Sequence, residues 1–128
     1  MAKILVIDDD QQIRELLHEI LERGGHDVLQ AENGLAGLRA VASEPVDIVI
    51  TDIIMPDKDG LETITELRKN HPAIKIIAIS GGGRQLNRDF LPTAQAFGAD
   101  LALYKPFRPQ DVIEAIEKVS KLEGAPSS

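Results

Sequence analysis

The sequence predicts an α/β protein in which a doubly wound, five-stranded parallel sheet carries five helices. Five short apolar runs, rich in Val and Ile, alternate along the chain with five segments in which apolar residues recur every three or four positions. Strands and helices that alternate in this way form an open, mostly parallel sheet with helices on both faces. At 128 residues, the chain is long enough for one domain with one full hydrophobic core.

The first half of the chain supplies two strands and two helices. Residues 3–7 form a β-branched apolar run that predicts the first strand, and residues 26–31 predict the second. Asp10 is a suitable N-cap for the first helix, and Gly24 is a suitable stop. The apolar residues of that helix are Ile13, Leu16, Leu17, Ile20 and Leu21. A second helix begins at Asn33, ends before Pro45, and is predicted to direct Leu35, Leu38 and Val41 inward.

The second half repeats the pattern. We predict strands at 46–52, 75–79 and 101–104, and helices at 60–69, around Phe90 to Phe97, and at 109–122. The apolar stripe of the last helix is predicted to bury Val112, Ile113, Ile116 and Val119. The domain is therefore expected to span residues 1–122, and residues 123–128 to form a disordered tail.

The composition argues against several kinds of partner and site. A net charge of −7 disfavours surfaces that neutralise nucleic-acid phosphates or anionic membranes. The chain has no cysteine, which excludes disulfides and thiolate metal sites. It shows no apolar run of transmembrane length and no signal peptide at its start, so a cytoplasmic location is expected.

Asp52 introduces a charge at the end of the most apolar strand, residues 46–52. An ionised carboxylate at the end of a buried strand is unfavourable unless it is paired or bound to a metal ion. Asp52 either caps the following turn, which is a common role of Asp, or serves as a nucleophile or metal ligand. The residue considered by itself favours neither interpretation.

Polar residues stand at the carboxyl ends of four predicted strands. Asp8 and Asp9 follow the first strand, Asp52 ends the third, Ser80 follows the fourth and Lys105 follows the fifth. Ligands of open parallel sheets bind outside these strand ends. Oxygen ligands without His or Cys favour a hard cation such as Mg²⁺. A carboxylate nucleophile, a cation and a lysine together suit phosphoryl transfer, which depends mainly on positioning and charge neutralisation.

These motifs resemble those of response-regulator receiver domains, the CheY-like family, over essentially the whole chain. The matching segments are Ile4-Leu5-Val6-Ile7-Asp8-Asp9, Asp52 with Met55-Pro56 and Asp59-Gly60, Ser80, and Lys105-Pro106-Phe107. Each is a weak signal alone, but the four in this order and spacing are highly specific. The resemblance implies the flavodoxin-like strand order 2-1-3-4-5, of which CheY is a standard example.

The resemblance also implies residue roles. Asp52 would be the phosphoacceptor, Ser80 the switch hydroxyl and Lys105 the cationic partner of the phosphoryl group. The implied Mg²⁺ ligands are Asp9, Asp52 and the backbone carbonyl of Ile54, with Asp8 acting through a bound water. In this family the bond after the lysine, here Lys105–Pro106, is often cis.

The favoured function is a phosphorylation-controlled signalling module of a two-component system. The three histidines lack metal-ligand spacing and are predicted to face solvent, so the donor histidine is expected on a partner kinase or phosphotransfer protein. The output face in the family comprises the fourth helix, the fifth strand and the last helix, which would contact a downstream protein. A phosphorelay intermediate is a variant of this function.

Two other functions are considered. A Mg²⁺-dependent phosphatase with an aspartyl-phosphate intermediate usually needs a second acid where Ile54 stands, so the protein is not expected to be an enzyme beyond its own phosphorylation and dephosphorylation. A receiver-like binding module that is never phosphorylated would not need Asp52, Ser80 and Lys105.

Overall fold

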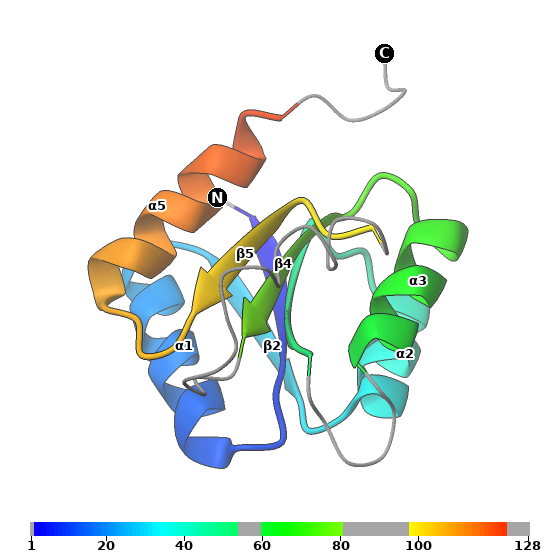
Figure 1. The fold of residues 1–128 in the computed structure, drawn as a ribbon, viewed down its shortest axis with the longest axis horizontal. Helices are drawn as coiled ribbons and strands as arrows, with labels where there is room; N and C mark the ends of the chain where they lie inside the picture. The colour runs from blue at the N-terminus through cyan, green and yellow to red at the C-terminus, as the bar shows by residue number, and fades with distance from the viewer. Residues whose placement is uncertain (1, 54–59, 81–97, 123–128) are drawn as a thin grey trace.

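The computed structural model describes residues 2–53, 60–80 and 98–122, and its fold is a five-stranded sheet between two helical layers (Figure 1). All strand pairs are parallel, and the order is β2-β1-β3-β4-β5. The strands are β1 (Lys3–Ile7), β2 (Asp27–Ala31), β3 (Ile48–Asp52), β4 (Lys75–Ser80) and β5 (Leu101–Tyr104). The predicted fold class and the strand order 2-1-3-4-5 are confirmed.

The helices lie on both faces of the sheet. They are α1 (Gln11–Arg23), α2 (Gly34–Ser43), α3 (Gly60–Asn70) and α5 (Pro109–Ser120). Helices α1 and α5 cover one face, and α2 and α3 cover the other (Figure 1). The helix predicted around Phe90 to Phe97 and the tail predicted at 123–128 lie outside the described residues. Within those residues, no helix combines the length and the apolar character that crossing a membrane requires.

Two helix starts follow from local side-chain chemistry. The Asp10 side chain accepts a hydrogen bond from the backbone N–H of Gln12 at the start of α1. The Asn33 side chain accepts one from Ala36 N–H at the start of α2. Such caps satisfy N–H groups that lack partners within the helix, and they confirm both predicted helix starts.

The core forms one layer on each side of the sheet because side chains alternate along a strand. From β1, Ile4 and Val6 pack toward α1 and α5, while Leu5 and Ile7 pack toward α2 and α3. All five residues of β3 are buried, as expected for a central strand covered by helices on both faces.

Two residues that were predicted to point inward, Leu35 and Ile113, are exposed. Leu35 is 50% exposed and Ile113 is 41% exposed; Leu16, an apolar residue of α1, is also 41% exposed. Helix α2 instead contacts β1 through Gly37, where an added Cβ would lie 2.8 Å from Ile7 Cγ1, and Leu35 points to the other side of that helix. Leu16 and Ile113 line a groove between α1 and α5. The periodicity of apolar residues identifies the apolar stripe of a helix, but it does not show which side of that stripe is buried against the sheet.

Candidate functional site

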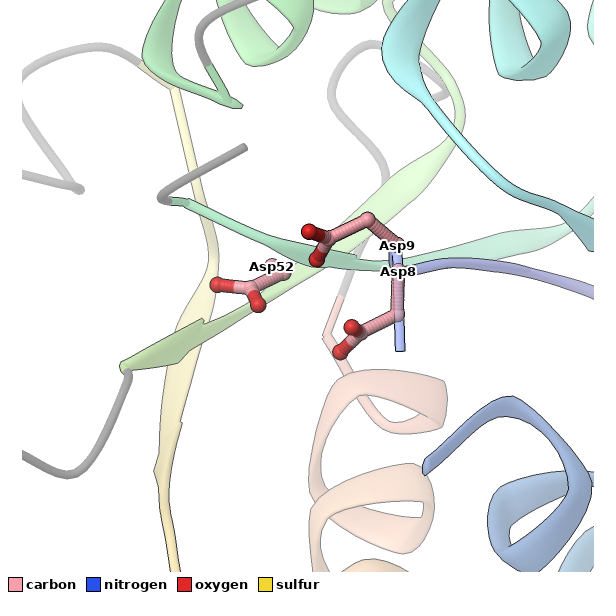
Figure 2. A group of neighbouring side chains, drawn as sticks. All are labelled: Asp8, Asp9 and Asp52. Carbon is pink, nitrogen blue, oxygen red and sulfur yellow. The ribbon is translucent and has the colours of Figure 1, made fainter. Parts of the chain in front are cut away.

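The carboxyl ends of β1 and β3 bring three carboxylates together. These strands are direct neighbours, with Ile7 opposite Thr51, so the residues that follow Ile7 lie beside Asp52. Figure 2 shows the side chains of Asp8 and Asp9 extending toward Asp52. One carboxylate oxygen from each residue lies within 4.8 Å of the others. The predicted convergence of these three acids is therefore present in the fold.

Asp8 is held in place by three hydrogen bonds, which involve both its backbone and its side chain. Its N–H donates to Ala31 O of β2 at 3.1 Å, and its Oδ1 accepts from Asp10 N–H at 2.9 Å. Its carbonyl oxygen accepts from Arg14 Nη1 at 2.7 Å. Its Oδ2 is buried and accepts no hydrogen bond within the described part of the chain. Asp8 therefore presents a fixed oxygen toward the centre of the cluster.

Lys105 places an ammonium group against this cluster. Its Nζ lies 3.3 Å from Asp52 Oδ2, to which it donates a hydrogen bond, and 3.6 Å from Asp8 Oδ2. The peptide bond between Lys105 and Pro106 is cis, as the resemblance implies. Strand β5 lies at the edge of the sheet, next to β4. Lys105, which follows β5, therefore reaches the ends of β1 and β3 from the β4 side of the sheet.

Burial and neighbouring charges shift the titration of this site. Burial raises the pKa of Asp8 from 3.8 to about 6; the hydrogen bond from the backbone of Asp10 opposes that rise, and the charge of Asp52 adds to it. Burial alone would lower the pKa of Lys105, but the carboxylates of Asp52 and Asp8 outweigh it, and the net pKa is raised. The lysine is therefore a permanent cation in this site at neutral pH.

The donor set fits a hard divalent cation. The cluster offers carboxylate oxygens only, one of which, Asp8 Oδ2, is a buried acceptor without a hydrogen-bond donor among the described residues. Mg²⁺ binds through one or two carboxylates and retains several waters, and the exposed side chain of Asp9 leaves the cluster open to solvent on one side. Asp8, Asp9 and Asp52 would therefore hold such an ion between them.

The structure unites four of the six predicted site residues: Asp8, Asp9, Asp52 and Lys105. Ser80 is the last residue of β4, where its backbone pairs with Tyr104. The Ser80 side chain and the whole of Ile54 lie outside the described residues, so the switch and carbonyl-ligand roles stay predictions.

The sequence predicted no role for Arg14, and the prediction that the three histidines face solvent is wrong. In the sequence, Arg14 is one of the polar residues of an amphipathic helix, and nothing indicates its contact with the Asp8 carbonyl, which is seen only in the fold. His18, His26 and His71 were all predicted to face solvent, but each of them is half-buried. The His18 ring contacts Gln30 and Glu22, and His26 Nδ1 accepts a hydrogen bond from Ala2 N–H.

Comparison with known proteins decides the family. A sequence profile of the response regulator receiver domain matches residues 4–117. The chain belongs to this family. The receiver domain is 34% identical to the chemotaxis protein CheY of Listeria monocytogenes over 122 residues, which cover 94% of this chain and 100% of CheY.

Longer relatives and solved structures agree with this assignment. The receiver domain is 35% identical to the transcriptional regulatory protein CpxR of Klebsiella pneumoniae over 119 residues, which are 93% of this chain and 49% of CpxR. The chain thus spans about half the length of this relative. The solved receiver domain of NtrX from Brucella abortus aligns with a TM-score of 0.86 at 30% identity, covering 94% of this chain and 99% of that one.

Proposed function

We propose that this receiver domain accepts a phosphoryl group on Asp52 and passes on the resulting change as a signal. One observation carries the proposal: Asp52, only 5% exposed, lies within 4.8 Å of two further carboxylates and 3.3 Å from the ammonium of Lys105. A turn cap would need neither neighbour. A buried carboxylate beside a fixed cation and a candidate Mg²⁺ site is suited to phosphoryl transfer.

The chemistry follows from the groups at the site. An oxygen of the Asp52 carboxylate attacks phosphorus; the new O–P bond forms as the bond from phosphorus to the donor nitrogen breaks, and the nitrogen keeps the electron pair. In the structure, Lys105 Nζ donates a hydrogen bond to Asp52 Oδ2; after phosphorylation it would donate to a phosphoryl oxygen and balance the charge of that oxygen. Mg²⁺ held by Asp8, Asp9 and Asp52 would neutralise charge on the phosphoryl oxygens when bound.

The partners follow from the same chemistry. We propose that the donor is the phosphohistidine of a sensor kinase or of a histidine phosphotransfer protein. We place this exchange in the cytoplasm and expect no catalysis beyond phosphorylation and dephosphorylation of Asp52. The output would be a protein contact through the face that includes β5 and α5, a face on which Tyr104 is 41% exposed.

Intact-protein mass spectrometry after incubation with acetyl phosphate tests the proposal. We expect a Mg²⁺-dependent gain of one phosphoryl group that Asp52→Ala abolishes. Asp27→Asn is the matched control, because Asp27 is an exposed carboxylate at the opposite end of the sheet, paired with Lys3; it should gain the group as the parent does. No gain in folded parent protein with Mg²⁺ present would favour the binding module that is never phosphorylated.

A further inference from the structure

We propose that Arg14 is a positioning residue of this site: it fixes the peptide between Asp8 and Asp9 and thereby preorganises both carboxylates for a divalent cation. The inference rests on the proposed function, since it assigns a role toward the Mg²⁺ of the same site. It concerns a side chain on α1 that belongs to none of the predicted ligand or acceptor positions.

The contact is short and directed at the peptide itself. Arg14 Nη1 donates to the carbonyl oxygen of Asp8 at 2.7 Å, a hydrogen bond strengthened by the charge of the guanidinium. The contact is partly buried, and Arg14 is anchored in the first turn of α1 by its own backbone N–H, which donates to Asp10 O. The side chain thus connects the first turn of α1 to the end of β1.

Holding this carbonyl determines where Asp9 points. The Asp8 carbonyl and the Asp9 N–H belong to one rigid peptide plane, so fixing the oxygen fixes the plane. The N–H and Oδ1 of Asp8 already have partners in Ala31 O and Asp10 N–H. Asp9 is exposed and is not held by packing, so its direction depends on the orientation of this peptide.

A second bond orients the guanidinium. Arg14 Nε donates to Gln30 Oε1 of β2 at 3.3 Å. Because arginine has only donors, the oxygen of the Gln30 amide must face it, and the amide nitrogen then donates to His18 Nδ1 at 3.1 Å. The His18 Nε2 proton is directed at Glu22, 3.2 Å away. This hydrogen-bonded chain holds the fork of Arg14 against the Asp8 carbonyl.

Mg²⁺ affinity measured by isothermal titration calorimetry tests the inference, with unfolding midpoints recorded in parallel. We expect Arg14→Met to bind Mg²⁺ about 5–10-fold more weakly, near the lower end for residues that orient metal ligands. Arg14→Lys keeps the charge but lacks the planar fork, so it should recover only part of the affinity. Arg23→Met, an exposed arginine on the same helix paired with Glu19, should bind within twofold of the parent.

Whether Arg14→Met binds Mg²⁺ more weakly or more tightly distinguishes a positioning role of Arg14 from a simple effect of its charge. Loss of a cation near an acidic cluster would by itself strengthen Mg²⁺ binding, whereas loss of positioning weakens it. Unchanged or tighter binding by Arg14→Met, with the parent binding normally, would therefore overturn the inference. A parent that binds no Mg²⁺ would overturn the proposed function and the inference with it. If Arg14→Met does not fold, Gln30→Ala decides, and Mg²⁺ affinity equal to the parent's would refute the role.

Discussion

At the scale of single residues, Asp8 shows how this site stores unfavourable electrostatic energy in the absence of metal. Its side chain is fully buried, its Oδ1 has a backbone donor, and its Oδ2 has the ammonium of Lys105 at 3.6 Å. The carboxylates of Asp52 and Asp9 add repulsion. A divalent cation at this point would relieve both burial and repulsion.

We expect Asp8→Asn to stabilise the metal-free protein at pH 7. Burial raises the pKa of Asp8 from 3.8 to about 6, so the folded state binds the proton more tightly than the unfolded state. The stability that this proton contributes is complete below pH 3.8 and is lost as the pH rises through about 6. Asparagine avoids that loss, which amounts to about 1–3 kcal/mol.

Urea unfolding of the parent and of Asp8→Asn at several pH values checks this expectation. The difference in the free energy of unfolding should grow from near zero at pH 3.8 to its full value above about pH 6. Carboxylates far from Asp8 titrate alike in both proteins and cancel in the difference. A difference that does not vary with pH would show that burial of the charge is not its source.

At the scale of elements, one side chain of α3 connects that helix to the residues just before β5. Arg68 donates to Gly98 O at 2.7 Å and to Asp100 Oδ2 at 2.8 Å. It also donates to Pro72 O and Ile74 O, each at 2.9 Å. The side chain therefore satisfies carbonyls that precede both β4 and β5, at the end of the sheet opposite the acid cluster.

Arg68→Ala should lower the free energy of unfolding by about 2–4 kcal/mol, because it leaves several carbonyls and the Asp100 carboxylate without their charged donor. The exposed neighbour Lys69 supplies the control, and Lys69→Ala should change stability by less than about 0.5 kcal/mol. Chemical denaturation measures both variants. Equal, small effects of the two substitutions would show that the Arg68 contacts contribute little to the fold.

At the scale of the whole molecule, one lysine lies among carboxylates at each end of the sheet. At the end where β1 begins, the ammonium of Lys3 lies 3.2 Å from Asp27 and 2.7 Å from Glu44. At the other end, Lys105 faces two carboxylates while Asp9 adds a third. The chain as a whole carries a net charge of −7. A bound divalent cation should therefore stabilise the entire domain.

Mg²⁺ at ten times its dissociation constant should stabilise the folded protein by about 1.4 kcal/mol. For a domain of this length, that corresponds to a rise in Tm of about 5 °C. Differential scanning calorimetry in MgCl₂ and in NaCl of equal ionic strength separates binding from charge screening, and Asp9→Asn should lose most of the Mg²⁺ effect. A rise no larger than that in NaCl would argue against a Mg²⁺ site.

Local patterns in the sequence were sufficient for the elements and for much of the site. The apolar run before Asp8 and the run ending in Asp52 predicted two buried strands, and the fold places both acids where those strands end. Asp10 and Asn33 predicted two helix starts that the structure confirms. These features depend on neighbouring residues only, so they could be read from the chain without knowledge of its packing.

The alternation of strands and helices could be predicted from local patterns alone, as could the acids at the strand ends and the lysine that follows the last strand. Which side of each apolar stripe is buried depends on how the helices pack against the sheet, and this packing leaves Leu35 and Ile113 exposed. The same packing sets which polar helix residues join distant segments, as Arg14 does with Asp8 and Arg68 with Gly98. The reason is physical: periodicity records the environment of one element, whereas these contacts depend on the distance and rotation between two elements.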